Sequence, residues 1–259
     1  MATLLELEAF LYNFAPKEGA MTWDNVGLLV GNPAKTATKV LVALDGTHGV
    51  VDEAIALGCD VIVTHHPIIN CKWAPVQTLR EDTVQGRLLR KLIAHDIGVI
   101  SMHTNLDVTD GGVNDVLAQA LGLEGIGALS EEGLGRVGTL PQAMEAKAFV
   151  AMVKETLQAN GVRYAPCDKP IVKVGVGGGA CRDYAKHALA LGCDAFVTAD
   201  VGYHDFQDAQ NAGMCLVDAG HFPTENPVCQ VVQQRLQVQF PELQVAVSQS
   251  HHELIQYYI

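Results

Sequence analysis

The sequence predicts an α/β fold made of two related lobes, each built on a helix-covered sheet that is largely parallel or mixed. Short apolar runs at residues 40–44, 61–64 and 98–102 have no polar alternation, as expected for strands buried on both faces. Segments of helical periodicity separate these runs. Strands that alternate with helices favour parallel pairing. A chain of 259 residues can form one large domain or two modest ones with real cores.

The elements follow in order from periodicity and end signals. Leu4, Leu7 and Leu11 recur at helical spacing and open the chain with an amphipathic helix. Gly58 suits the end of a second helix. We expect helices at 51–57, 82–95, 113–121 and from 228 onwards, and strands at 28–30, 40–44, 61–64, 98–102, 174–176, 195–198 and 214–217. We expect 103–107 to be a loop and 245–259 to be largely strand.

An internal similarity supports the two lobes. Ala56-Leu57-Gly58-Cys59-Asp60-Val61-Ile62-Val63-Thr64 resembles Ala190-Leu191-Gly192-Cys193-Asp194-Ala195-Phe196-Val197-Thr198, at an offset of 193 − 59 = 134. The Gly-rich stretch 122–140 is the expected boundary region. The first lobe is therefore expected at 1–125 together with 226–259, the second at 126–225, and a metal site between the lobes.

Composition limits the class of protein. The chain has 17 basic and 29 acidic residues, a net charge of −12, which argues against general binding to nucleic acid. We find no basic n-region of a secretory signal and no apolar stretch long enough to span a bilayer. Seven scattered cysteines without a C-x-x-C pair are typical of a reduced protein, so a cytoplasmic location is expected.

Two adjacent histidines follow the apolar run Val61-Ile62-Val63-Thr64. Ligands bind beyond the carboxyl ends of such strands, and Pro67 disfavours helix at His66. A single histidine here would suit a core residue whose ring nitrogens are hydrogen-bonded within the protein. His65 and His66 together suit a pair of metal ions, with one imidazole for each.

Two further polar patches also follow predicted strands. The first is His103-Thr104-Asn105-Leu106-Asp107, whose His and Asp are otherwise typical of capping or surface groups. The second is Asp218-Ala219-Gly220-His221-Phe222-Pro223-Thr224-Glu225, which by itself also fits an ordinary helix start. The shared position at strand ends predicts convergence. Imidazole and carboxylate ligands suit Fe, Mn, Zn or Co, and Glu225 is the candidate bridging ligand between two ions.

These motifs, together with Trp23-Asp24-Asn25-Val26-Gly27-Leu28, resemble the NIF3-like family, whose members are also called GTP cyclohydrolase 1 type 2 homologues. The resemblance spans nearly the whole chain. It implies a two-lobed α/β fold and a dinuclear metal site on His65, His66, Asp107, His221 and Glu225, with two divalent ions per subunit. It also implies a toroidal homohexamer with the metal sites facing its cavity. One departure is Ile68-Ile69-Asn70, where family members commonly carry an aromatic residue at the last position.

The resemblance implies a metal-dependent hydrolase that opens the imidazole ring of GTP or acts on another nucleotide. His103, Asp200 and His204 are the candidate catalytic groups for proton transfer, although Asp200 and His204 equally suit a helix start. The alternative is a non-catalytic metal-binding scaffold whose ring engages other proteins. A third hypothesis, action on nucleic acid within the ring, is disfavoured by the acidic charge.

Some remaining features have competing interpretations. Gly175-Val176-Gly177-Gly178-Gly179-Ala180 fits a dinucleotide fingerprint, but a tight strand-to-helix turn is favoured over a phosphate cradle. Asp45 and His48 follow a strand and are open between structural and functional roles. His251 and His252 are expected on a solvated strand face, and Tyr257 and Tyr258 are candidates for a subunit interface.

Overall fold

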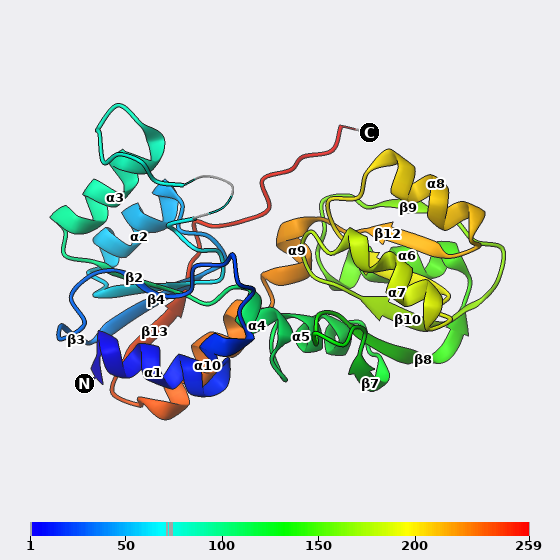
Figure 1. The fold of residues 1–259 in the computed structure, drawn as a ribbon, viewed down its shortest axis with the longest axis horizontal. Coiled ribbons are helices and arrows are strands. Elements are labelled where there is room, and N and C mark those ends of the chain that lie inside the picture. The colour runs from blue at the N-terminus through cyan, green and yellow to red at the C-terminus, as the bar shows by residue number, and fades with distance from the viewer. Residues whose placement is uncertain (1, 71, 73–74, 259) are drawn as a thin grey trace. The chain divides into compact units, whose positions relative to one another are not determined.

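The computed structural model describes residues 2–70, 72 and 75–258, and it divides into two compact units. Unit 1 comprises Met1–Thr109 and Val228–His252, and unit 2 comprises Asp110–Pro227 and Glu253–Ile259 (Figure 1). The first boundary, expected near 125, lies at Thr109 because the next helix packs into the core of unit 2. Cys71, one of the seven cysteines, lies outside the described residues.

Unit 1 contains a five-stranded sheet in the order β13-β4-β5-β6-β2. The first four strands are parallel to their neighbours and β2 is antiparallel to β6. The strands are β2 (Gly27–Val30), β4 (Lys39–Ala43), β5 (Val61–Thr64), β6 (Gly98–Ser101) and β13 (Gln244–Val247), and a separate antiparallel pair is formed by β1 (Ala2–Thr3) and β3 (Thr36–Ala37).

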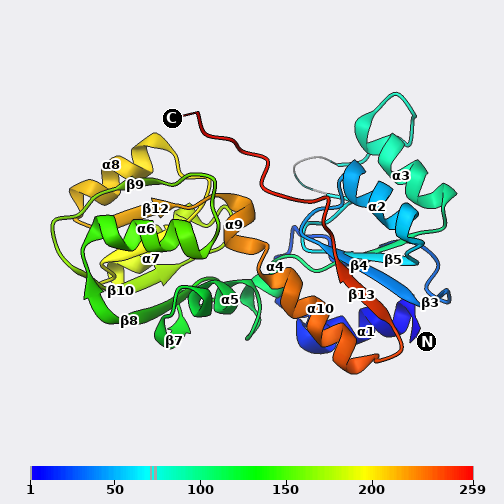
Figure 2. The ribbon, with the colours of Figure 1, turned by 180° about the vertical axis from the view of Figure 1, so that it is seen from behind.

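Helices cover both faces of this sheet, as Figure 1 shows. On one face, Leu41, Ile62 and Val99 pack against apolar residues of α2 and α3. On the other face lie α1 and α10, the latter running beside β13 (Figure 2). The helices of unit 1 are α1 (Leu4–Phe14), the 3-10 helix η1 (Lys17–Gly19), α2 (His48–Leu57), α3 (Val84–Ala94), α4 (Thr104–Val108) and α10 (Val228–Gln239).

Unit 2 contains a six-stranded mixed sheet in the order β7-β8-β10-β11-β12-β9. The central strands β10, β11 and β12 are parallel, and the outer strands run antiparallel to their neighbours. The strands are β7 (Glu124–Ala128), β8 (Arg136–Met144), β9 (Arg163–Ala165), β10 (Ile171–Val176), β11 (Ala195–Thr198) and β12 (Cys215–Asp218).

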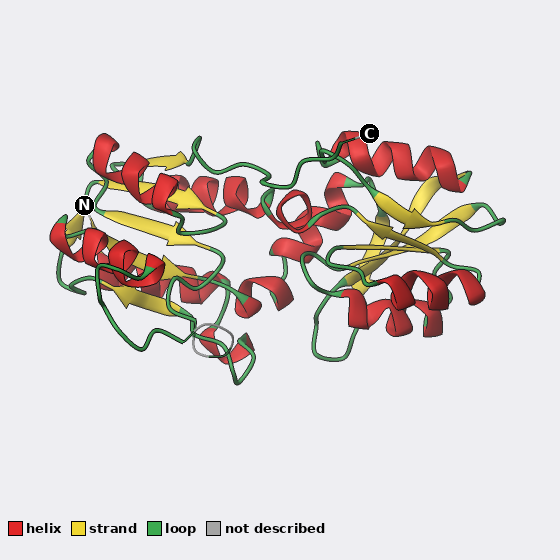
Figure 3. Cartoon of the chain, turned by 90° about the horizontal axis from the view of Figure 1, so that it is seen from above, coloured by secondary structure: helices red, strands yellow, loops and turns green. Residues whose placement is uncertain are grey.

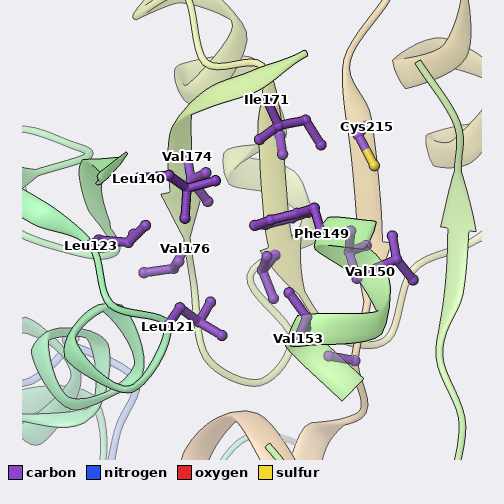
Figure 4. Close-up of a cluster of buried hydrophobic side chains, with 14 of the residues drawn as sticks. Leu121, Leu123, Leu140, Phe149, Val150, Val153, Ile171, Val174, Val176 and Cys215 are labelled. Carbon is purple, nitrogen blue, oxygen red and sulfur yellow. The ribbon is translucent and has the colours of Figure 1, made fainter. Parts of the chain in front are cut away.

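The sheet of unit 2 is also covered on both faces (Figure 3). Phe149, Val150 and Val153 of α6 pack on one face against Val174 and its neighbours, as Figure 4 shows. Phe196 and residues of α7 and α8 fill the other face. The helices of unit 2 are α5 (Val113–Ala120), α6 (Ala146–Thr156), the 3-10 helix η2 (Arg182–Tyr184), α7 (Ala185–Ala190), α8 (Tyr203–Asn211) and α9 (His221–Glu225). The α/β class is thus confirmed, and no helix in the described part of the chain is long and apolar enough to cross a membrane.

The internal similarity corresponds to repeated contacts. Oδ2 of Asp60 accepts hydrogen bonds from the backbone N–H groups of Thr38 and Lys39. Oδ2 of Asp194 accepts the same two bonds from Val172 and Lys173, each 134 residues later. Each carboxylate therefore ties the start of one strand to the start of the next.

Three segments differ from the sequence-based expectation. Residues 103–107, expected as a loop, belong largely to the short helix α4. The stretch 122–140 contains β7 and much of β8, because its glycines are placed within an antiparallel pair rather than in a linker. Strand pairing at the end of the chain is confined to β13, and among the described residues 248–258 form no strand.

Candidate functional site

The carboxyl ends of β4, β5 and β6 lie side by side in unit 1. Ala43 pairs with Thr64, and Thr64 pairs with Ser101. The residues that follow these strands therefore meet at one edge of the sheet, as the sequence pattern predicts for parallel strands.

Three imidazoles gather at this edge. The ring of His65 lies 4.9 Å from that of His66 and 5.2 Å from that of His103, centroid to centroid. The rings of His66 and His103 are 5.5 Å apart, and one nitrogen of each ring lies within 4.8 Å of the others. Such a group can hold a metal ion, and His103, a candidate for proton transfer, lies within it.

Each of the three rings is held through Nδ1. Nδ1 of His65 donates to the backbone oxygen of Met102 at 2.9 Å. Nδ1 of His66 donates to Oδ1 of Asp45 at 2.7 Å, and Nδ1 of His103 donates to Oδ1 of Asp24 at 2.8 Å. This pattern sets the tautomer that leaves Nε2 as the ligating nitrogen, which is the arrangement usual for metal-binding histidines.

Asp24 belongs to the candidate site, although the sequence pattern places it only within the motif Trp23–Leu28. Its side chain is almost fully buried. Burial disfavours its charge, but hydrogen bonds from His103 and from the backbone and hydroxyl of Thr104 hold the pKa of Asp24 well below its ordinary value. Asp24 is therefore an ionised partner that orients His103.

Asp107 lies on α4, four residues after His103. Its backbone N–H donates to the His103 oxygen, and its Oδ1 lies 3.5 Å from Nε2 of the buried His65. The helix thus presents a carboxylate to the same nitrogen that is expected to bind metal. Unit 1 by itself brings together His65, His66, His103 and Asp107.

In unit 2, His221 and Glu225 occupy the ends of the short helix α9, directly after β12. Gly220 permits this abrupt turn because its φ of +92° lies in the region that favours glycine. Nε2 of His221 lies 3.1 Å from Oε2 of Glu225, whose side chain is 5% exposed. The spacing of four residues on a helix therefore places both candidate ligands together.

Asp200 is a third residue beside the pair His221 and Glu225. Its Oδ2 accepts a hydrogen bond from Nδ1 of His221 at 2.7 Å. Burial lowers the pKa of His221, but the hydrogen bonds and charges of Asp200 and Glu225 outweigh burial and raise that pKa to about 11. A ring that holds positive charge between two carboxylates marks a place where a cation is stabilised.

The glycine turn after β10 is packed against this pair. A Cβ added to Gly179 would lie 2.0 Å from Oε1 of Glu225 and 3.0 Å from Nε2 of His221. The N–H groups of Gly177, Gly178 and Gly179 donate to Val197, Asn114 and Thr224 respectively. Because these amides are engaged within the protein, the turn serves close packing rather than a phosphate cradle.

Other sequence candidates lie elsewhere. His204 is exposed on the first turn of α8 beside Tyr203, and among the described residues it forms no hydrogen bond with Asp200 or His221. His48 opens α2. His251, expected on a solvated strand face, lies beyond the end of β13 at Val247, and its side chain is 5% exposed against Asp45. His252 is exposed, as are Tyr257 and Tyr258.

The chemistry of these donors fits divalent metal. Imidazole nitrogens fixed through Nδ1 and carboxylates held close to them suit Fe, Mn, Zn or Co better than Ca or Mg. Both units supply buried His, Asp or Glu side chains of this kind.

Comparisons with known proteins extend over nearly the whole chain. Residues 2–253 match the family model Duf34/NIF3 (NGG1p interacting factor 3). A Clostridium perfringens protein named GTP cyclohydrolase 1 type 2 homolog is 39% identical over 219 residues, covering 82% of this chain and 81% of the relative. A Streptomyces coelicolor protein of the same name is 37% identical over 243 residues, covering 89% and 84%.

Solved structures show the same fold. A Bacillus cereus protein related to NIF3 superposes with a TM-score of 0.93 at 26% identity, covering 100% of this chain and 99% of its own. A hypothetical protein of Staphylococcus aureus superposes with a TM-score of 0.90 at 30% identity, covering 99% of each chain.

Proposed function

Because the chain belongs to the Duf34/NIF3 (NGG1p interacting factor 3) family, we propose that it is a dinuclear-metal-dependent hydrolase. His65, His66 and Asp107 of unit 1 and His221 and Glu225 of unit 2 are the proposed ligands. The assignment of both groups to one centre rests on the family resemblance. When bound, two divalent ions would polarise an electrophile and lower the pKa of water towards neutrality.

The observation that carries the proposal is the shared arrangement of the four imidazoles. Each donates through Nδ1 to an oxygen: His65 to a backbone carbonyl, and His66, His103 and His221 to aspartates. Ordinary surface histidines need no such partner. His65, His66 and His221 are the proposed ligands among them, and rings turned in this way are typical of metal ligands.

The remaining residues have distinct proposed roles. Since Asp24 holds Nδ1–H of His103, Nε2 of His103 is the atom that can accept and return a proton. Asp200 is engaged with His221, which favours orientation of that ring over direct proton transfer. A catalytic role for His204 would be tested by His204→Ala, which should then lower turnover while leaving metal content unchanged.

The substrate proposal follows the names of the relatives. A GTP cyclohydrolase 1 type 2 activity would hydrolyse the imidazole ring of GTP, and another nucleotide is the alternative within the same class. Protein loaded with Mn²⁺, Zn²⁺, Co²⁺ or Fe²⁺ should be challenged with GTP and with a panel of phosphoesters. We expect metal-dependent turnover that His65→Ala abolishes. Turnover equal in wild type and His65→Ala would contradict the enzyme proposal.

Metal content tests the centre separately from activity. Protein purified without chelator or nickel should contain about two ions per chain by the two-metal argument. A shared centre predicts that His65→Ala and Glu225→Ala each lose bound metal, although the residues belong to different units. Two ions without any turnover would favour the alternative of a metal-binding scaffold.

We also propose that the chain assembles as a homo-oligomer, expected from the family resemblance to be a hexamer. Light scattering on the full chain tests this directly. A monomer at micromolar concentration would contradict the expectation.

A further inference from the structure

We propose that His251 is a positioning residue for the metal ligand His66 and that it acts through Asp45. This inference rests on the proposed metal-binding function and adds a residue from the end of the chain to it. All three residues belong to unit 1.

Asp45 lies between two imidazoles. Its Oδ1 accepts the hydrogen bond from Nδ1 of His66 at 2.7 Å, while its Oδ2 lies 3.2 Å from Nε2 of His251. Each carboxylate oxygen thus serves a different ring. A carboxylate held at both oxygens has little freedom to rotate away from His66.

The two histidines of the pair at 251–252 have different environments. The side chain of His251 is 5% exposed, although Asp45 is 38% exposed. His252 is exposed. An imidazole withdrawn from water and set against a more open carboxylate indicates a specific contact rather than a solvated surface pair.

Hydrogen bonds hold the segment before His251, and they fix the position from which His251 contacts Asp45. Glu53 of α2 accepts hydrogen bonds from the backbone N–H of Gln249 at 2.9 Å and of Ser250 at 3.1 Å. It also accepts hydrogen bonds from the hydroxyls of Ser248 and Ser250. Since β13 ends at Val247, strand pairing does not fix the residues that lead to His251. The hydrogen bonds to Glu53 fix them instead.

The consequence concerns the ligating nitrogen of His66. A carboxylate on Nδ1–H fixes the tautomer and ring plane and makes Nε2 a stronger ligand, and loss of such partners typically weakens metal affinity by about 10–100-fold. His251 fixes the carboxylate that does this. Its removal should therefore weaken metal binding in the same direction as removal of Asp45.

The test is a Co²⁺ titration of the full chain followed by visible absorption, which reports ligand geometry independently of turnover. We expect His251→Phe, which keeps a ring but has no donor, to weaken Co²⁺ affinity by about tenfold, the lower end of the range for lost partners, and to change the absorption bands. His251→Gln, whose amide can donate to Asp45, should restore most of the affinity. His252→Ala is the matched control and should behave as wild type.

The outcomes separate this inference from the function on which it rests. If wild-type protein binds no Co²⁺, the metal-binding proposal fails. If wild type binds Co²⁺ but His251→Phe binds it equally well with unchanged bands, the positioning role of His251 is wrong. If His251→Gln is as impaired as His251→Phe while thermal unfolding of the metal-free proteins is the same, donation to Asp45 is not the cause and the inference is overturned.

Discussion

The carboxylate of Asp200 accepts a hydrogen bond from His221, and Asp200 holds a backbone conformation that few non-glycine residues adopt. The hydrogen bond from Nδ1 of His221 is 2.7 Å long, and φ of Asp200 is +54°. A non-glycine residue in this region costs of order 1–3 kcal/mol. The strain is retained because the turn after β11 aims the carboxylate at the ring, while the preceding Ala199 is anchored by its N–H to Gly179.

Substitution of Asp200 should separate stability from metal affinity. Asp200→Gly relieves the backbone strain and removes the carboxylate, so the free energy of unfolding should rise or stay equal while metal affinity falls by about 10–100-fold. Asp200→Asn keeps a side chain that tolerates this conformation and should lose affinity alone. Urea unfolding and Co²⁺ titration measure the two effects. Wild-type affinity in both variants would show that Asp200 does not orient His221.

Gly179 should tolerate no side chain, and Gly192 provides a matched control. Both glycines have positive φ, +60° and +74°, but a Cβ at Gly192 would meet nothing within 4 Å. Gly192→Ala should therefore cost only the conformational penalty, about 1 kcal/mol. Gly179→Ala adds a clash with the buried Glu225, so it should cost more in urea unfolding and also lower bound metal. Equal losses of stability with intact metal binding would contradict the close packing of the turn on this pair.

The paired residues Asp60 and Asp194 predict a pH dependence of stability. Burial opposes their charge, but backbone hydrogen bonds lower the pKa of each carboxyl below its ordinary value. A lowered folded-state pKa adds stability above the unfolded-state pKa of about 4, and this stability is lost as pH falls through the folded-state value. Asp60→Asn and Asp194→Asn should each lose about 1–3 kcal/mol at pH 7.

The difference in free energy of unfolding between wild type and each of these two variants should shrink as the pH falls. Below about pH 4 these carboxyls take up protons in the unfolded chain before they do so in the folded protein, so the free energies of unfolding of wild type and variants should converge. Urea unfolding between pH 3 and pH 7 checks this, with Asp168→Asn as a control because Asp168 is exposed. A difference that is constant across the range would show that the charge does not contribute.

Much of the site could be inferred from the sequence because its residues follow strands directly. The run before His65 is apolar and β-branched, and parallel strands bring the residues after them to one edge. The aspartates that accept hydrogen bonds from the site histidines are harder to assign from the sequence. Asp24 reaches His103 from 79 positions away along the chain, and no local pattern encodes such a contact. Asp45 and Asp200 could be flagged as candidates, but their partners depend on tertiary packing.

The segments whose structure differs from the sequence-based expectation also depend on contacts between residues far apart in the chain. Glycines at 122–140 indicate a linker by composition, yet β7 and β8 pair across them, since strand pairing is decided by the partner strand as well as by local propensity. The polar neighbours of His251 predict a solvated strand face for it. Its burial follows from Glu53 anchoring the preceding residues, a contact across almost 200 positions that the sequence does not reveal.

Thiol reactivity should follow burial. Burial raises the pKa of Cys59 and of Cys193 to about 11 and that of Cys215 to about 12. At pH 8 a thiol with a pKa of 11 is about one-thousandth thiolate, and the thiolate is the nucleophile. Of the six cysteines in the described part of the chain, iodoacetamide should therefore modify the partly exposed Cys167 and Cys181 first in the native protein.

Peptide mass spectrometry over time measures this order. Cys59, Cys193, Cys215 and Cys229, all buried, should be modified only when urea unfolds the chain. The equivalent positions Cys59 and Cys193, one in each unit, should become reactive at the urea concentration that unfolds their own unit. Modification of either in native protein as fast as that of Cys167 would mean that its unit opens readily, because neither thiol can react while it is packed against its helix and sheet.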